Sequence, residues 1–289
     1  MRMSWFVVLW LAGFVSLLRA APGERADITP FERGNEGIVL AVTLNGRGSF
    51  RFLLDTGSTH TAVSAKTAAG IGAPTVAKAP MGSAAGSRDT LVVRIDALEV
   101  GAVRVDHLLA SVVELANIGA DGIDGVLGQD ALAPLRYTID FRERRVMWWP
   151  NDSRVAGGNS FALKPSHGRF LVSLPQRQSL LRLVPDSGAA SLLLFDPDRT
   201  LPVTQLPAPA TLTTMSGATE VRLAKIRELS IGALTLRDVP AVVADRDRSE
   251  PDEIDGLLPL HLFDRVTIDG PHRRMIVEKS SASRRLMFF

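Results

Sequence analysis

The chain has 289 residues, of which 46% are hydrophobic and 22% charged, and it contains no cysteine. This length and composition allow two globular domains of usual size whose cores form without disulfides. The 33 basic and 31 acidic residues nearly balance. That balance gives no indication of a nucleic-acid partner, and the lack of cysteine excludes a thiol nucleophile.

Residues 1–20 have the pattern of an export signal. Arg2 precedes an apolar run over residues 5–18, and Ala20 offers a small residue for cleavage. The run is short for a transmembrane helix, although Arg19 after it leaves an uncleaved membrane anchor as the alternative. In both cases we expect the body of the protein outside the cytoplasm. The lack of cysteine favours a bacterial periplasmic or secreted protein.

The first predicted elements follow an extended lead-in at residues 21–36. Residues 37–44 are rich in β-branched side chains and predict a strand. The turn Asn45-Gly46-Arg47-Gly48 has the residues of a tight hairpin. The returning strand, 49–54, is expected to deliver Asp55 to the loop at its end.

A linker is predicted at residues 151–160, which are rich in glycine and small polar residues. The second lobe repeats the hairpin, with strands expected at 169–174 and 179–184. Few segments have helical periodicity, and the best candidates follow Gly128 and surround 260–263. The chain is therefore predicted to be all-β. The expected division is a signal at 1–20, a lead-in at 21–36, an N-terminal lobe at 37–150, a linker at 151–160, a C-terminal lobe at 161–279 and a tail at 280–289.

An internal repeat relates the two lobes. Asp55-Thr56-Gly57-Ser58 is matched by Asp186-Ser187-Gly188-Ala189, 131 residues later. Further pairs recur at a spacing of 131 or, for the last, 129: Gly86 and Gly217, Gly101 and Gly232, 123–127 and 254–258, 138–140 and 267–269. Two copies of one lobe are expected to pack about an approximate two-fold axis, which brings Asp55 and Asp186 face to face.

Two facing aspartates predict a particular acid-base chemistry. Carboxyl groups this close do not both ionise readily, so one proton is shared between them. The ionised member takes a proton from a water, and the protonated member polarises a carbonyl group. The pair Asp55 and Asp186 therefore predicts hydrolysis of a peptide bond by an activated water.

The same motifs resemble the aspartic proteases, the group of pepsin and the retropepsins. The signatures are the two Asp-Thr/Ser-Gly tripeptides and the Gly-Val-Leu-Gly-Gln-Asp of residues 125–130, and the resemblance covers roughly residues 37–278. It implies a bilobal all-β fold, with two homologous β-barrel-like lobes around a cleft, and Asp55 and Asp186 as the catalytic pair. The residues implied to support the active-site loops are Thr56, Gly57, Ser58, Ser187, Gly188 and Ala189.

The second copy departs from that family pattern. Pro259 stands where the first copy has Gly128, and Pro185 directly precedes Asp186. Tyr137, the only tyrosine, lies outside the region of the flap tyrosine of pepsins. These departures favour an alternative, a catalytically inactive protein of the same fold that binds peptide or envelope partners.

Each copy has glycine and small residues at the tip of an expected hairpin. Such a tip suits a flap that closes over a bound peptide and excludes water, and an ordinary hairpin is the alternative. Two flaps would resemble a fused retropepsin dimer more than a pepsin. The flap candidates are Met81, Gly82, Gly86, Met215, Ser216 and Gly217.

Other site chemistries find little support in the sequence. The five histidines are scattered without metal-ligand spacing, and no Gly-x-Ser-x-Gly motif is present, so no metal or other cofactor is expected. Trp148 and Trp149 are expected to pack in the core or between the lobes. The repeated aspartates expected in turns and backbone hydrogen bonds are Asp124, Asp140, Asp255 and Asp269.

The sequence thus predicts an exported aspartic endopeptidase that acts on peptides or proteins. One chain carries both copies, so we expect a monomer whose lobes form an intramolecular pseudo-dimer. Membrane contact is expected only through residues 1–20, if these remain attached. The cleavage preference is not readable, because the pockets of the cleft come from both lobes.

Overall fold

The structure, a computed structural model, describes residues 25–34, 37–83, 86–115, 122–150, 158–177, 179–195, 201, 203–214, 217–246 and 250–279. The expected signal at 1–20 and the expected tail at 280–289 lie outside these residues. Within the described part of the chain the regular elements are strands, apart from two short α-helices and one 3-10 helix. The all-β prediction is therefore confirmed. No helix among the described residues has the length and apolar character needed to span a bilayer.

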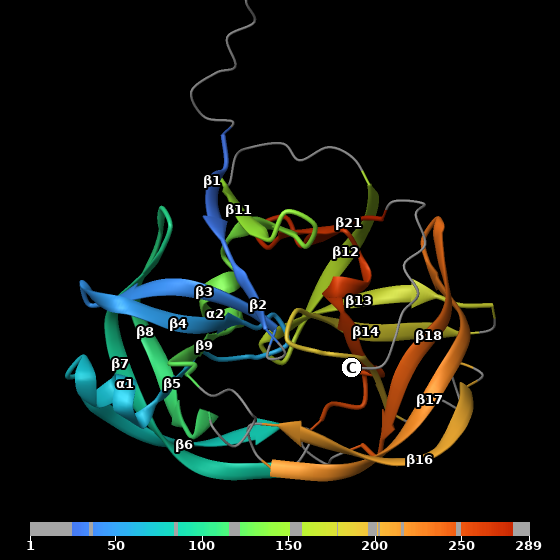
Figure 1. Cartoon of the computed structure of the whole chain (residues 1–289), viewed down its shortest axis with the longest axis horizontal. Helices are drawn as coiled ribbons and strands as arrows, with labels where there is room; N and C mark the ends of the chain where they lie inside the picture. The colour runs from blue at the N-terminus through green and yellow to red at the C-terminus, as the bar shows by residue number, and fades with distance from the viewer. Residues whose placement is uncertain are drawn as a thin grey trace, which may run out of the picture.

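The first lobe is built on an eight-stranded sheet in the order β2-β3-β4-β9-β5-β8-β7-β6. An additional pairing of β3 with β7 curls the sheet toward a barrel. This lobe lies on the left of Figure 1. Its strands are β2 (Glu32–Gly34), β3 (Gly37–Leu44), β4 (Arg47–Leu54), β5 (Ala62–Ser64), β6 (Thr75–Ser83), β7 (Gly86–Val100), β8 (Val103–Val113) and β9 (Gly125–Leu127).

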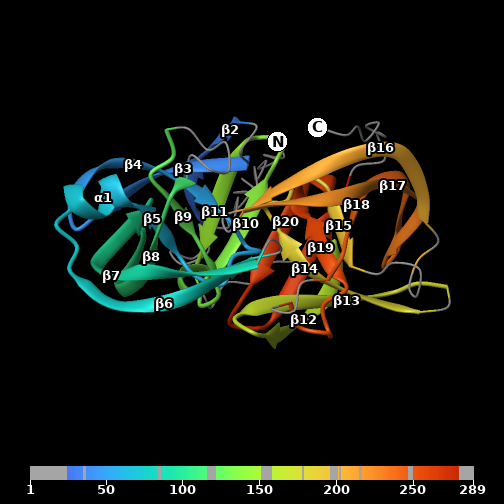
Figure 2. The ribbon, with the colours of Figure 1, turned by 90° about the horizontal axis from the view of Figure 1, so that it is seen from below.

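The second lobe belongs to a thirteen-stranded sheet in the order β1-β11-β10-β20-β21-β12-β13-β14-β19-β15-β18-β17-β16. The first strands of this order join the two lobes, and Figure 2 places β10 and β20 at the centre. Its strands are β1 (Asp27–Pro30), β10 (Arg136–Asp140), β11 (Arg145–Trp149), β12 (Asn159–Ser166), β13 (Arg169–Pro175), β14 (Leu180–Asp186), β15 (Leu192–Phe195), β16 (Val203–Thr214), β17 (Gly217–Ile231), β18 (Leu234–Ala244), β19 (Gly256–Pro259), β20 (Arg265–Asp269) and β21 (Arg274–Glu278).

The strands of the two lobes have the same spacing along the chain as the sequence repeat. β7, β8 and β9 begin 131 residues before β17, β18 and β19, whereas β10 and β11 begin 129 residues before β20 and β21. In both lobes the strand that leads to the aspartate runs parallel to the short strand after Ile-Asp-Gly, as β4 beside β9 and β14 beside β19. The two lobes are therefore copies in topology as well as in sequence.

The approximate two-fold axis passes between β10 and β20. These strands are antiparallel, and the register pairs Thr138 with its own counterpart Thr267. The two hydroxyl groups lie 2.7 Å apart, and Nε1 of Trp149 donates to Oγ1 of Thr138 (2.9 Å). Because equivalent residues meet here, the sheet itself fixes one lobe against the other.

Two equivalent ion pairs flank this axis. Arg136 pairs with Asp269, and Arg265 donates through Nε to Oδ2 of Asp140 (2.8 Å). Asp140 is fully buried, and it also accepts from the backbone amide of Arg142 (3.1 Å). The expected turn role of these aspartates is confirmed, and the ion pairs between the lobes are a second role that the sequence did not indicate.

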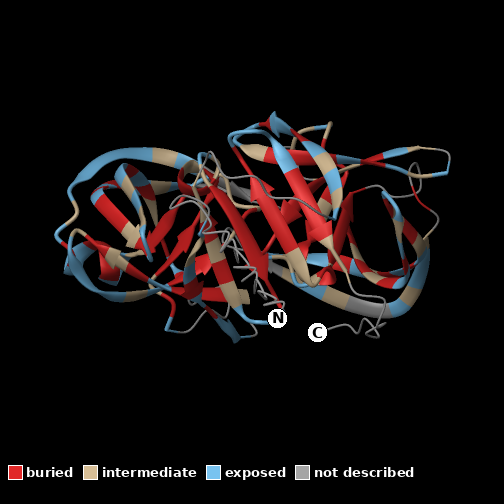
Figure 3. Cartoon of the chain, turned by 90° about the horizontal axis from the view of Figure 1, so that it is seen from above, coloured by how far each residue is buried: buried red, intermediate tan, exposed pale blue. Residues whose placement is uncertain are grey.

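Buried residues fill the inside of each lobe and the strands that join them (Figure 3). Tyr137 on β10 is fully buried, and its ring centroid lies 5.8 Å from that of Trp148. Burial raises the pKa of the Tyr137 phenol well above its ordinary value. Trp148 is 3% exposed, so the expected packing of this tryptophan in the core is confirmed.

Some elements differ from the predictions. The helices after Gly128 and around 260–263 are present as α2 (Gln129–Leu132) and the 3-10 helix η3 (Leu260–Leu262), but α1 (Ala65–Gly70) was not predicted. A helix of six residues is too short for a periodic pattern, and Ser64 caps it by accepting from the Thr67 amide (3.0 Å).

Strands also occur in segments to which the sequence assigned no strand. β1 and β2 lie within the lead-in 21–36, and β12 begins at Asn159, inside the expected linker. β1 pairs with β11 and β2 with β3. β1 depends on β11, which lies far away in the sequence, so no local pattern indicates it. β2 instead pairs with β3, the next strand in the chain.

Thr267→Val is expected to lower the free energy of unfolding by about 1 to 2 kcal/mol, because the buried Thr138 hydroxyl loses its partner across the axis. Thr138→Val should cost more, because Trp149 then loses its acceptor as well. Urea unfolding of both variants measures the difference. Equal costs for the two variants would contradict this account of the axis.

Candidate active site

Two loops present the aspartates that the repeat predicts. Asp55 directly follows β4, and its amide donates to the carbonyl of Leu127 on β9 (3.1 Å). Asp186 ends β14 and is in register with Pro259 on β19. In both lobes the parallel neighbour therefore fixes where the strand ends and where the loop begins. The segments 55–58 and 186–189 are called the Asp55 loop and the Asp186 loop below.

The two carboxyl groups face each other across the axis. A Cβ atom added to Gly57 would lie 2.4 Å from Cγ of Asp186, and one added to Gly188 would lie 3.0 Å from Cγ of Asp55. Each carboxyl group thus sits against the glycine of the opposite loop, where a larger residue would displace it. Each group is close enough to shift the pKa of the other.

Thr56 and Ser187 tie the two loops together. The Thr56 amide donates to Oγ of Ser187 (3.0 Å), and the Ser187 amide donates to Oγ1 of Thr56 (3.0 Å). The Thr56 hydroxyl donates to the carbonyl of Pro185 (2.8 Å), and the Ser187 hydroxyl to that of Leu54 (2.6 Å). Because both side chains are buried, these bonds hold the loops at a fixed separation without competition from water.

Backbone amides hold one oxygen of each carboxyl group. Oδ1 accepts two amide hydrogen bonds in both loops, from residues two and three positions further on. The donors are Gly57 (2.9 Å) and Ser58 (3.1 Å) for Asp55, and Gly188 (2.7 Å) and Ala189 (3.0 Å) for Asp186. The backbone therefore surrounds the two carboxyl groups in the same way.

The two groups nevertheless differ in their affinity for a proton. Asp186 is 6% exposed, whereas Asp55 is less completely buried. Burial raises the pKa of both groups, and the negative charge of Asp55 raises that of Asp186 further, well above its ordinary value of 3.8. Between the raised pKa of Asp55 and the still higher pKa of Asp186 the pair therefore keeps one proton, with Asp186 as its favoured carrier.

Two residues of the 125–130 signature support the first loop, although the sequence indicated no role for them. Gln129 is 3% exposed and donates through Nε2 to the carbonyl of Thr56 (2.8 Å). Asp130 accepts from the amide and the hydroxyl of Thr61 (2.9 Å and 2.8 Å). Their place in the 125–130 signature could have indicated a role at the site, but only the fold shows that this turn contacts the Asp55 loop.

The two prolines of the second copy are compatible with its loop. The carbonyl of Pro185 is the acceptor for the Thr56 hydroxyl. Pro259 has a φ of −64°, which the proline ring favours, and it remains in register with Asp186. The replacement of the first copy's Gly128 by Pro259 therefore changes the residue but keeps the strand that supports the loop.

The flap candidates lie on two long hairpins. Figures 1 and 2 show the β6–β7 and β16–β17 hairpins extending from opposite lobes and approaching each other along one edge of the molecule. Met81 and Gly82 lie near the end of β6, Gly86 begins β7, Gly217 begins β17, and Met215 and Ser216 lie outside the described residues. Both lobes thus contribute a hairpin.

The remaining repeated aspartates have structural contacts. Oδ2 of Asp124 accepts from the amide of Arg51 (2.9 Å), and Oδ2 of Asp255 accepts from that of Arg182 (2.8 Å). This agrees with the backbone role expected for them. In the part of the chain that the structure describes, no cluster of three or more histidine, cysteine, aspartate or glutamate residues could hold a metal ion.

The comparison with protein families agrees with the motifs. A family model described as aspartyl protease matches residues 40–131 and 177–261. The two segments contain Asp55 and Asp186 and together span more than half of the chain. The chain belongs to the aspartyl protease family, so the predicted resemblance is confirmed.

The comparison with solved structures supports the fold. The crystal structure of an aspartic proteinase from Irpex lacteus matches with a TM-score of 0.52 and 12% sequence identity, over 89% of this chain and 98% of that chain. At this identity the likeness shows the fold alone, and it confirms the predicted bilobal all-β architecture. No curated protein matches the chain.

Asp186→Asn is expected to stabilise the protein at neutral pH by about 1 kcal/mol or more, because the amide requires neither a retained proton nor a second buried charge. The raised pKa of Asp186 means that the wild type has its full stability below pH 3.8 and loses it as the pH rises through the higher folded value. The advantage of the variant should therefore be smallest near pH 3 and grow as the pH rises. Urea unfolding from about pH 3 to 8 measures it, and an advantage that shrinks with rising pH would contradict the assignment.

Proposed function

We propose that the protein is an aspartic endopeptidase that hydrolyses peptide bonds in peptides or proteins. The observation that carries the proposal is the pair of carboxyl groups held face to face by interlocked loops. Membership of the aspartyl protease family supports the reaction class. The catalytic roles of Asp55 and Asp186 are our inference from the geometry and the shared proton.

In this proposal Asp55 acts first as the base and Asp186 as the acid. Ionised Asp55 takes a proton from a water as the water oxygen bonds to the peptide carbonyl carbon, and Asp186 gives its proton to the carbonyl oxygen. The tetrahedral diol then collapses with cleavage of the C–N bond. Asp55 gives its proton to the leaving nitrogen, and one hydroxyl of the diol returns a proton to Asp186, which restores the starting state.

We infer that both long hairpins act as flaps over the substrate. The support is their symmetric origin on the two lobes and their approach to each other in Figures 1 and 2. Closure of such hairpins over a bound peptide excludes bulk water from the carboxyl pair. Two flaps of this kind would make the site more similar to a fused retropepsin dimer than to a pepsin.

One chain supplies both loops, so the proposed enzyme functions as a monomer. We also infer from residues 1–20 that the chain is exported. Cell fractionation is expected to recover it from the periplasm or the medium, with its first residue near Ala20. Recovery in the membrane fraction with residues 1–20 attached would favour an anchor, and recovery in the cytoplasm would contradict export.

Asp55→Asn and Asp186→Asn are each expected to lower kcat/KM for peptide cleavage at least about a thousandfold, because each removes one of the two groups that move protons. Both variants should still fold, since the amide oxygen can accept the same backbone hydrogen bonds. The measurement is cleavage of a diverse peptide mixture across pH, followed by mass spectrometry.

Asp106→Asn is the matched control, because Asp106 is an exposed aspartate that pairs with Arg104 on the surface. It should cleave peptides as the wild type does. Retained cleavage in either variant of the pair would reject the shared mechanism. A wild-type chain that binds peptides without cleaving them would instead favour the inactive peptide-binding protein.

A further inference from the structure

The two copies differ at one position that lies beside a carboxyl loop. Gly168, at the tip of the β12–β13 hairpin, contacts the first lobe: a Cβ atom added to it would lie 3.5 Å from Cβ of Thr59, just after the Asp55 loop. The next residue is Arg169. The equivalent residue of the first copy is Gly37, because β3 pairs Leu40 with Phe52 as β13 pairs Val172 with Leu183. The second copy therefore places an arginine beside the Asp55 loop, whereas the first copy has a glycine at the matching place beside the Asp186 loop.

Arg169 is held by an ion pair that the first copy lacks. Its Nη2 donates to Oε1 of Glu250 (2.6 Å), and the side chains are 13% and 9% exposed. The first copy has Gly119 at the position of Glu250. Nε of Arg169 is buried and makes no hydrogen bond within the described part of the chain. The ion pair thus fixes the guanidinium group, but the carboxylate of Glu250 meets it at Nη2 and not at Nε.

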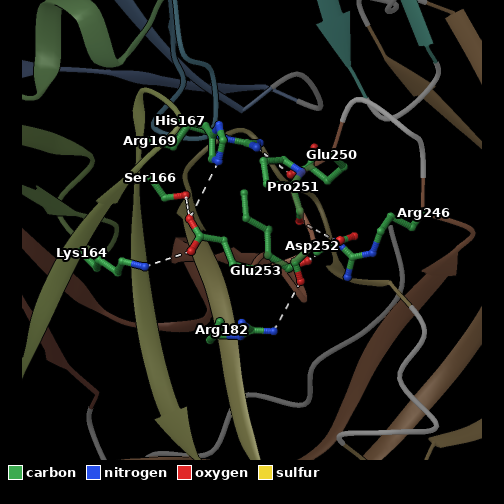
Figure 4. A network of polar contacts seen from close by, with 11 residues as sticks. Lys164, Ser166, His167, Arg169, Arg182, Arg246, Glu250, Pro251, Asp252 and Glu253 are labelled. Atoms are coloured by element: carbon green, nitrogen blue, oxygen red, sulfur yellow. Dashed lines mark hydrogen bonds and ion pairs between the residues drawn. The ribbon is translucent and has the colours of Figure 1, made fainter.

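The loop that carries Glu250 is held in place by its own hydrogen bonds and ion pairs, as Figure 4 shows. Glu253 accepts from Nζ of Lys164 (2.9 Å) and from the hydroxyl of Ser166 on β12. Arg246 donates to two backbone carbonyls of the same loop, both at 2.7 Å. Contacts on both sides therefore hold Glu250, and through it the guanidinium group of Arg169, in one place.

The charges around the two carboxyl groups are unequal, although their backbone bonds are alike. Burial raises the pKa of Asp55, while its backbone hydrogen bonds, its bond to Asp186 and the positive charge of Arg169 lower it. For Asp186, burial and the negative charge of Asp55 both raise the pKa. Arg169 therefore favours negative charge on one member of the pair.

The titratable group behind the other loop does not oppose this effect. His261 hydrogen-bonds to the backbone of Ala189, and burial together with the positive charge of Arg33 lowers its pKa to about 4. It is uncharged at neutral pH and adds no positive charge near Asp186. Arg33 and Lys279 are the cations on that side and act on His261, whereas Arg169 acts on Asp55.

We propose that Arg169 is a positioning residue that places the shared proton, so that Asp55 is the ionised, proton-accepting member of the pair and Asp186 is the proton donor. The inference rests on the proposed function for its catalytic meaning, but the place of the proton can be measured without activity. The identical repeat alone would leave the two carboxyl groups interchangeable. The Arg169–Glu250 pair gives each of them a separate role.

The test is a ¹³C NMR titration of the aspartate carboxyl groups in the full chain, beside the pH profile of kcat/KM. Arg169→Ile, which removes the positive charge, should raise the titration midpoint of Asp55 and the acid limb of the profile by about half a pH unit or more. Glu250→Gln keeps the arginine but removes the compensating charge, so it should move both downward. Arg169→Lys should stay close to the wild type.

Lys164→Met is the control, because Lys164 belongs to the same network but is exposed and pairs with Glu253. It should leave the Asp55 midpoint unchanged. An unchanged midpoint in Arg169→Ile, or an equal shift in Lys164→Met, would overturn the proposal. If Arg169→Ile does not fold, Glu250→Gln decides, and the absence of its downward shift overturns the proposal. Shifts as expected in a protein that cleaves no peptide would reject the proposed function and support the inference about the proton.

Discussion

The contact between two buried carboxyl groups is the constraint on which the rest of the structure depends. Two like charges at this distance repel and are poorly solvated, so the pair stays together only if the surrounding chain holds it. The reciprocal hydrogen bonds of Thr56 and Ser187 hold the two carboxyl loops together at the axis. The Thr138–Thr267 contact of β10 and β20 holds the same axis within the sheet that joins the lobes. Repulsion is then relieved by retaining a proton rather than by moving the loops apart.

Duplication explains how such a pair arises, and divergence explains how its members differ. When two copies of a lobe pack symmetrically, residues near the axis meet their own counterparts, as Thr138 and Thr267 do on β10 and β20. Acid-base catalysis, however, needs one group to give a proton and the other to take one. In our proposal the substitutions between the copies, above all Gly37 against Arg169, supply the difference that symmetry alone does not.

The elements that could be predicted are those with a local cause. The β-branched residues of 37–44 form β3, and Asn45 and Gly46 adopt the positive φ values of 50° and 70° that a tight turn requires. The elements that were missed lack such a cause. α1 is a capped helix of six residues, and β1 becomes a strand because β11 offers hydrogen-bond partners from elsewhere in the chain.

By itself the sequence determined the repeated Asp-Thr/Ser-Gly motifs, their spacing and hence the two-lobed all-β family fold, because a repeat specifies its own symmetry. Only the tertiary structure decided which unlike residues meet. Gln129 lies against Thr56 from 73 residues away, and Arg136 pairs with Asp269 across 133. The approach of Arg169 to the Asp55 loop is another such contact. These contacts join different positions of the two copies or distant parts of one lobe, and they depend on how whole sheets pack, which no local pattern encodes.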